Sequence, residues 1–97
     1  MTKEIHNLKI TPKNFEDVRD RRMSFQIRKC DRDYKVNDFL YLQEYDEWDC
    51  GFTGKTIPCR VTHILREDEG LQEGFVLLNI DVIKLLIHDG LKYKYNV

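Results

Sequence analysis

The chain has 97 residues, of which 41% are hydrophobic and 34% charged, and its formal net charge is −1. This length predicts one domain, and the composition excludes a disordered chain and a membrane protein. No apolar run reaches the roughly 18 residues of a spanning helix, and the first residues contain no apolar signal segment, so we expect no membrane partner.

The chain begins with a predicted strand and a predicted helix. Residues 5–10 alternate in the manner of a strand. Thr11 is typical of a helix N-cap and Pro12 of a first helical position, so a helix is predicted over 12–21. Phe15 and Val18 fall on one face of it at helical spacing.

A second strand follows at residues 25–28. Its alternation predicts Phe25 and Ile27 on the core side, and it places Ser24, Gln26 and Arg28 together on the opposite face, because strand side chains alternate. Polar turns are predicted after it, at residues 31–33 and 36–38.

Three more strands are predicted over residues 39–44, 56–65 and 75–80. In the second of these, Pro58 predicts an edge or a bulge at the start. Its shared inward face is expected to hold Ile57, Cys59, Val61, His63 and Leu65. The acidic loop at 46–51 contains Trp48, which we expect to plug an end of the barrel or to cover a ligand.

Five strands and one early helix predict a mainly β fold with α (α+β), with a curved or closed sheet. We expect a single domain over 1–97, with a core at about 5–81 and a C-terminal extension at 82–97. A helix capped by Asp81 and a further strand both fit the start of that extension. Residues 91–95 fit an edge strand or a mobile tail.

The three cysteines are odd in number and form no C-x-x-C pair. This argues against a disulfide framework and predicts a reducing, cytoplasmic location. A zinc site needs four ligands at short spacings, whereas the three histidines are isolated from one another and from the cysteines. We therefore expect neither a metal nor a cofactor.

Charge is distributed unevenly along the chain. Residues 1–35 carry ten Lys and Arg against six Asp and Glu, whereas residues 36–97 carry six against eleven. Two explanations fit this asymmetry: an anion-binding face, or basic residues that are simply solvated at the end of a helix and in a hairpin. Because the whole chain is not basic, any nucleic-acid contact should be local.

The assembled residues resemble a known family. The similarity is carried by His6 to Ile10, Phe15, Phe25 to Lys29, Asp31 to Asp38, Phe52 to Gly54, Val61 to Leu65 and Gly74 to Ile80. They are similar to a small bacterial and phage family of unassigned function within the activating-signal-cointegrator homology (ASCH) superfamily. The resemblance implies a PUA-like β-barrel with one prominent helix after the first strand, and a cleft beside that helix for RNA or a nucleotide.

Some ASCH proteins are amidohydrolases that act on acylated cytidine. Their reactive lysine and threonine align with Met23 and Gln26, neither of which can serve as a nucleophile or a general base. Ser24 supplies a hydroxyl, but the sequence places no base beside it. We therefore assign no catalytic residue.

A binding function uses the residues that are present. Arg28 has a planar fork suited to phosphate, and the neighbouring Lys9, Lys29 and Arg32 add positive potential. Gln26 can hydrogen-bond a base and Tyr34 can stack on one. The alternatives are an ion pair of Arg28 with Asp31, Asp33 or Glu44, and packing of Tyr34 against the barrel wall.

The sequence thus predicts a module that binds RNA or a nucleotide-like ligand without catalysis. The expected binding residues are Lys9, Ser24, Gln26, Arg28, Lys29, Arg32 and Tyr34. Two alternatives stay open: a nucleoside amidohydrolase of the ASCH type, and a protein-interaction module that uses a sheet edge or the tail at Tyr93 and Tyr95.

Overall fold

The computed structural model of the protein describes residues 3–83 and 88–89. The elements in this part of the chain are β1 (Ile5–Ile10), α1 (Pro12–Arg19), β2 (Phe25–Lys29), β3 (Phe39–Asp46), β4 (Gly51–Leu65), the 3-10 turn η1 (Glu67–Glu69), β5 (Phe75–Val82) and β6 (His88–Asp89). A mainly β fold with one α-helix after the first strand is confirmed.

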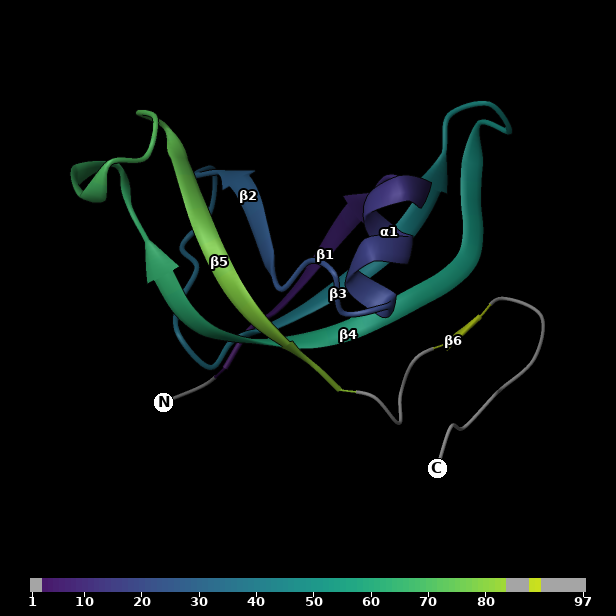
Figure 1. Ribbon diagram of the computed structural model, residues 1–97, viewed down its shortest axis with the longest axis horizontal. Helices are drawn as coiled ribbons and strands as arrows, with labels where there is room; N and C mark the ends of the chain where they lie inside the picture. Colours follow the sequence, from purple (N-terminus) through teal and green to yellow (C-terminus); the bar gives the residue numbers. More distant parts are fainter. Residues whose placement is uncertain (1–2, 84–87, 90–97) are drawn as a thin grey trace.

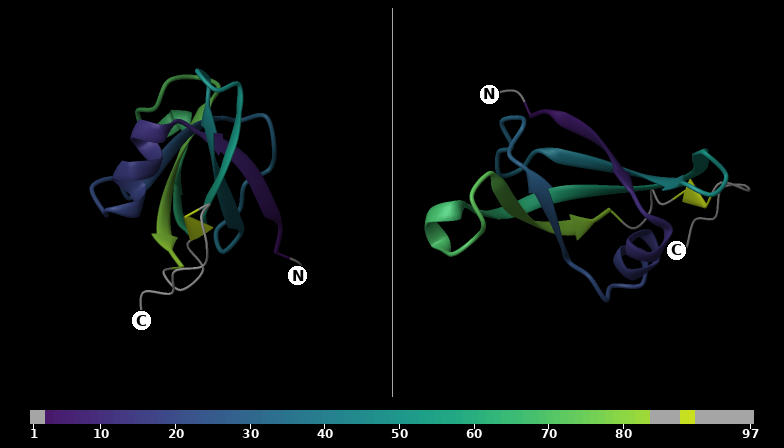
Figure 2. Two further views of the ribbon diagram at one scale, coloured as in Figure 1. Left: turned by 90° about the vertical axis from the view of Figure 1, so that its right-hand side faces the viewer. Right: turned by 90° about the horizontal axis from the view of Figure 1, so that it is seen from above.

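The strands form one sheet in the order β1-β3-β4-β5-β2, and β6 pairs with β4. β1 runs parallel to β3, and the other pairs are antiparallel. The sheet curls into a half-barrel, and α1 lies in its hollow (Figure 1). The two end strands of this order, β1 and β2, flank the hollow (Figure 2).

Helix α1 begins as predicted and ends earlier. The Thr11 hydroxyl accepts a hydrogen bond from the backbone N–H of Asn14 at 3.3 Å, and Pro12 occupies the first turn. Phe15 and Val18 are buried against the sheet. The predicted helix over 12–21 stops short because Arg21 has a φ of 66°, which no right-handed helix accommodates.

The core lies between the concave face of the sheet and α1. Alternate residues of β1, β3 and β5 point into it, as the strand period requires. Its buried hydrophobic residues are Leu8, Ile10, Phe15, Val18, Tyr34, Leu40, Leu42, Ile57, Cys59, Val61, Val76, Leu78 and Ile80.

Strand β2 faces the opposite way from the prediction. Gln26 is buried, whereas Phe25 and Ile27 are exposed on the outer face. The predicted alternation of the strand is confirmed. The prediction that Phe25 and Ile27 face the core, with Gln26 on the opposite side, is wrong. On the inner side of β2, the buried Gln26 and the half-buried Arg28 take the places that apolar residues hold in the neighbouring strands.

A shift of register in β4 changes the predicted inward set. Ile57, Cys59 and Val61 are buried, but His63 is exposed. The pairing with β5 slips between Val61 and His63, and an extra residue in one strand reverses which side chains point inward.

Pro58 lies in the middle of β4 and not at its start, and β3 pairs with β4 on one side there. Pro58 is opposite Tyr41 of β3. On its other side, β6 pairs with Lys55 and Thr56, and β5 pairs from Cys59 onward. On this second side Pro58 falls between the residues that pair with β6 and those that pair with β5. Neither pairing needs the backbone N–H that proline lacks.

The β3–β4 hairpin is longer than predicted and extends beyond the rest of the sheet (Figure 1). Trp48 at its tip is 95% exposed, so it neither plugs the barrel nor covers a cleft. After Ile80, Asp81 and Val82 continue β5. The predicted element at 91–95 and the tail at Tyr93 and Tyr95 lie outside the described residues.

Candidate functional site

Two adjoining hollows lie between β1 and β2, and they have Lys9 and Arg28 in common. The helix-side cleft has a volume of about 290 Å³ and is lined by Lys9, Ile10, Thr11, Asn14, Met23, Phe25, Gln26, Ile27 and Arg28. The basic hollow has a volume of about 370 Å³ and is lined by Asn7, Leu8, Lys9, Arg28, Lys29, Asp31, Arg32 and Tyr34.

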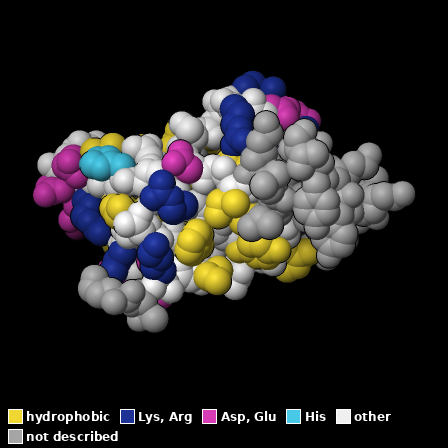
Figure 3. Space-filling model, turned by 90° about the horizontal axis from the view of Figure 1, so that it is seen from below, with side chains coloured by type: hydrophobic (Ala, Val, Ile, Leu, Met, Phe, Trp, Pro, Cys, Tyr) yellow, Lys and Arg dark blue, Asp and Glu magenta, His cyan; other side chains and the backbone are white. Residues whose placement is uncertain are grey.

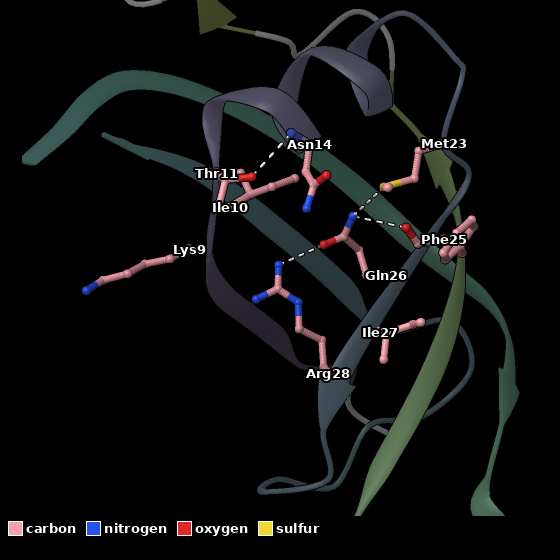
Figure 4. A pocket seen from close by; sticks show the side chains of 9 residues that line it. All are labelled: Lys9, Ile10, Thr11, Asn14, Met23, Phe25, Gln26, Ile27 and Arg28. Atoms are coloured by element: carbon pink, nitrogen blue, oxygen red, sulfur yellow. Dashed lines mark hydrogen bonds between the residues drawn. The ribbon is translucent and has the colours of Figure 1, made fainter. Parts of the chain in front are cut away.

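Arg28 reaches from β2 into the space between the two end strands (Figure 4). Its Nη2 donates to the Oε1 of Gln26 at 2.7 Å. Its Nε is buried and has no hydrogen-bond partner, an arrangement that is costly for a charged group. Burial lowers the pKa of Arg28, but an arginine keeps its proton at any physiological pH.

The acids proposed as alternative partners of Arg28 are engaged elsewhere. Asp31 pairs with Arg32 at 3.7 Å, and Asp33 pairs with Lys35 at 3.6 Å. Glu44 accepts a hydrogen bond from the Thr53 hydroxyl at 2.8 Å. Among the residues that the structure describes, Arg28 therefore has no ion-pair partner.

Gln26 holds Arg28 in place. Besides accepting from Arg28, its amide nitrogen donates to the backbone oxygen of Phe25 at 3.0 Å and lies 3.6 Å from the sulfur of Met23 (Figure 4). These contacts fix the orientation of the amide and leave one lone pair of its oxygen open. The main action of Gln26 is thus on Arg28.

Lys29 and Arg32 line the basic hollow with Arg28, but Lys9 points away (Figure 4). The Lys9 Nζ lies 4.3 Å from the centre of the Tyr45 ring, a cation–π contact. Its charge contributes to the field at the site from the outer side of β1. The predicted basic group is therefore assembled from β2 and the turn after it.

Two predicted residues lie apart from the cleft. Tyr34 is only 2% exposed, and its ring packs 4.8 Å from that of His6, so its faces are not open for stacking. Ser24 lines a different hollow with Arg21 and Asp81. Tyr34 therefore packs in the core, which was the alternative to a stacking role.

Sequence reasoning missed Ile10, Thr11 and Asn14 as lining residues of the cleft. Thr11 was identified as a helix cap only. Asn14 projects from the first turn of α1 toward the same space as Gln26 (Figure 4). The signal was present in the predicted helix start, since residues at a helix N-terminus are positioned to meet a ligand in a neighbouring cleft.

A buried polar network lies next to Tyr34, one of the lining residues of the basic hollow, because the His6 ring packs against that of Tyr34. The Nε2 of His6 lies 2.8 Å from Oδ2 of Asp38. The carboxylate also accepts the backbone N–H of Glu4 at 3.2 Å and of Lys35 at 3.0 Å. Burial alone raises the pKa of Asp38, but these hydrogen bonds outweigh it and the net pKa lies below 3.8.

Among residues 3–83 and 88–89, no group of three or more His, Cys, Asp and Glu side chains lies close enough together to hold a metal ion. No helix in that part of the chain is long and apolar enough to cross a membrane.

Comparison with known proteins gives a family and a relative, both without an assigned activity. A family model described as "Domain of unknown function (DUF3850)" matches residues 5–80. The chain is also 34% identical over 80 residues to the "Uncharacterized 12.9 kDa protein in GpA 3'region" of Escherichia phage P2. That match covers 81% of this chain and 70% of the phage protein.

Proposed function

We propose a function from the site itself, because this chain belongs to the DUF3850 family, a family of unknown function. The protein is a module that binds RNA or a nucleotide-like ligand between β1 and β2, without catalysis. The proposal includes membership of the ASCH superfamily and a PUA-like fold. It rests on the quoted resemblance and is supported by a half-barrel with a helix directly after its first strand.

One observation carries the proposal: the Nε of Arg28 is buried without a hydrogen-bond partner, and Arg28 forms no ion pair among the described residues. A buried unpaired donor costs about 1–3 kcal/mol, so an anionic ligand that accepts from it recovers this penalty on binding. Phosphate suits the planar fork of arginine, which can donate two parallel hydrogen bonds.

The two hollows divide the ligand between them. A phosphate is held at Arg28, with Lys29 and Arg32 of the basic hollow adding positive potential. A base or another flat polar group enters the helix-side cleft, where Ile10 and Met23 give apolar contact and Asn14 an amide for hydrogen bonding. Tyr34 has no stacking role, because it is in the core.

The residues of the cleft favour binding over hydrolysis. Its titratable side chains among the described residues are Arg28, which stays protonated, and Lys9, which points away. Met23 and Gln26 occupy the positions of the reactive lysine and threonine, and the Ser24 hydroxyl lines another hollow. We expect no turnover of acylated cytidine.

A cytoplasmic location is part of the same proposal. Cys30, Cys50 and Cys59 are all free thiols. Exposed thiols such as those of Cys30 and Cys50 persist where glutathione and thioredoxin keep them reduced.

The test is a fluorescence-polarisation titration of a labelled short single-stranded RNA, with nucleoside monophosphates as competitors, at two salt concentrations. Arg28→Ala should weaken binding about ten- to a hundredfold, the value of a charge-assisted contact of roughly 1.5–3 kcal/mol. Arg60→Ala is the matched control, since Arg60 lies on β4, is paired with Asp81 and lines neither hollow.

Thermal unfolding of both variants separates binding from stability. An Arg28→Ala protein with a lower melting temperature but unchanged affinity would refute the binding role of Arg28. If the unaltered protein shows no salt-dependent binding of RNA and no competition by nucleotides, the proposed function itself fails.

A further inference from the structure

The tip of the β3–β4 hairpin exposes the single tryptophan of the chain. Trp48 is 95% exposed, and Phe52, at the start of β4 in the same hairpin, is 56% exposed. Tryptophan is the side chain with most to gain from burial, and it is enriched among the anchor residues of protein interfaces. A tryptophan held almost entirely in water is therefore a candidate contact point for a partner.

The turn that carries Trp48 is ordered by its own hydrogen bonds. The Trp48 backbone N–H donates to Oδ1 of Asp46 at 2.9 Å, and the Cys50 N–H donates to the Glu47 carbonyl at 3.2 Å. Below the turn, the rings of Tyr45 and Phe52 meet edge to face at 5.1 Å. The tip is thus preorganised, which lowers the entropy cost of binding.

The charges around Trp48 define the partner. Asp46, Glu47 and Asp49 surround it, and none of them has an ion pair among the described residues. Three carboxylates repel nucleic acid, so this tip does not extend an RNA surface. Its chemistry fits an apolar recess with a cationic rim.

The protein itself has such a recess. The helix-side cleft has Ile10 and Met23 in its walls and Arg28 at its edge, and Lys29 and Arg32 line the adjoining hollow. The guanidinium of Arg28 suits both an indole face and a carboxylate. Trp48 is almost fully exposed and so does not occupy the cleft of its own chain, which leaves that cleft open to the tip of another copy.

We propose that the protein associates with itself head to tail, through insertion of Trp48 and its acidic neighbours into the helix-side cleft of a second copy. The contact is heterologous, so it leaves a free tip and a free cleft at the two ends of each pair. The same cleft is used by the proposed function, but the inference does not depend on which ligand binds there. A ligand in the cleft competes with the second copy.

Two other exposed surfaces contain apolar side chains. From below, basic and hydrophobic side chains gather in neighbouring areas of the face (Figure 3). Phe25 and Ile27 make a further exposed apolar pair on the outer side of β2. Only the hairpin tip has a complementary partner within the described part of the molecule.

The first measurement uses Trp48 as its own probe, because no other tryptophan contributes to the emission. From low micromolar to near millimolar concentration, the sedimentation coefficient should rise and the Trp48 emission should shift to the blue. Both changes should be reversed at about 1 M salt, where the screening length falls to roughly 3 Å. A protein that stays monomeric with water-exposed emission overturns the proposal.

A pair of complementary variants tests the head-to-tail geometry. Trp48→Ala keeps the cleft and loses the anchor, whereas Arg28→Ala keeps the anchor and weakens the cleft. Each alone should associate about tenfold or more weakly than the unaltered protein. Mixed, they should form a one-to-one pair, and the single Trp48 of the Arg28→Ala protein should shift to the blue. An Arg28→Ala protein that associates with itself as tightly as the unaltered protein, or a mixture that pairs no better than each variant alone, overturns it.

Charge reversal at the tip supplies a control that cannot disturb the core. Asp49→Lys should weaken association about tenfold, and Asp68→Lys, an equal change of charge in η1, should leave it unchanged. Equal loss in both variants would show an effect of net charge only and refute the proposal. Trp48→Ala should keep the RNA or nucleotide affinity of the unaltered protein, so this inference and the proposed function fail separately.

Discussion

At the scale of single residues, the charge available to a ligand depends on the residue beside Arg28. The Oε1 of Gln26 accepts a hydrogen bond from Nη2 of Arg28 at 2.7 Å, but a neutral amide does not neutralise the positive charge of the guanidinium. Gln26→Glu would place a carboxylate at that distance and pair the charge within the protein. We expect about a tenfold loss of RNA or nucleotide affinity and a weaker dependence on salt.

The control for this prediction is Gln72→Glu, which changes the net charge equally on an exposed loop. It should leave the affinity within about twofold of the unaltered protein, because a distant exposed charge is largely screened. Equal affinities for Gln26→Glu and the unaltered protein in polarisation titrations would mean that Arg28 does not meet an anion.

Because hydrogen bonds in the folded protein stabilise the charged form of Asp38, we expect the free energy of unfolding to fall in acid. Burial opposes ionisation of Asp38, but its hydrogen bonds outweigh this and hold its pKa below the ordinary value. Its contribution to stability is therefore present above the ordinary pKa of an aspartate and is lost as pH falls through the lower folded pKa. Asp38→Asn should cost about 1–3 kcal/mol near neutral pH, because an amide NH₂ cannot accept from the backbone N–H groups that the carboxylate serves. The variant should also show a flatter pH dependence.

Urea unfolding at pH 7, 4 and 3 measures both effects, with Asp68→Asn in the exposed 3-10 turn η1 as the control. Identical pH profiles for Asp38→Asn and the unaltered protein would show that Asp38 does not couple protonation to folding.

At the scale of elements, α1 depends on its N-cap. It has only eight residues, and an isolated helix of that length is unstable in water. Thr11→Ala removes the hydroxyl that accepts from Asn14 and should lower the free energy of unfolding by about 1 kcal/mol, whereas Thr11→Ser should retain most of it. Urea denaturation gives both values, and equal losses in the two variants would exclude a capping role.

The elements themselves were largely predictable. The N-cap and first-position signals located the start of α1, and alternation located β1, β2, β3 and β5 near their true bounds. The predicted strand over 56–65 misses the first five residues of β4, which begins at Gly51. The orientation of β2 was not predictable by that rule, because Gln26 and Arg28 line a cleft where a core strand would place apolar residues. Local departures from the apolar-inside rule are expected at functional sites.

Two further features depend on tertiary structure. The slip between Val61 and His63 turns His63 outward, and no local signal in β4 marks it. The contact of Lys9 with Tyr45 depends on the parallel pairing of β1 with β3, which alternation alone does not define. Basic residues near Arg28 were predicted together, whereas Tyr34 and Ser24 lie apart from the cleft.

At the scale of the whole molecule, the cysteines report on global unfolding. Burial raises the pKa of the Cys59 thiol to about 12, while Cys30 and Cys50 are exposed. The folded protein should therefore give two fast-reacting thiols with a disulfide reagent at pH 8, and the third should react only when the core opens. Three equally fast thiols would show that the core around Cys59 is accessible.

The residues that line the helix-side cleft and the basic hollow all fall between positions 7 and 34. Most of β3, β4 and β5 supplies the platform on which this one continuous stretch is mounted. The proposed binding surface and most of the sheet that supports it are thus encoded in consecutive parts of the gene. A single crossover near codon 35 would exchange all the lining residues of both hollows between two related chains while leaving β3, β4 and β5 intact.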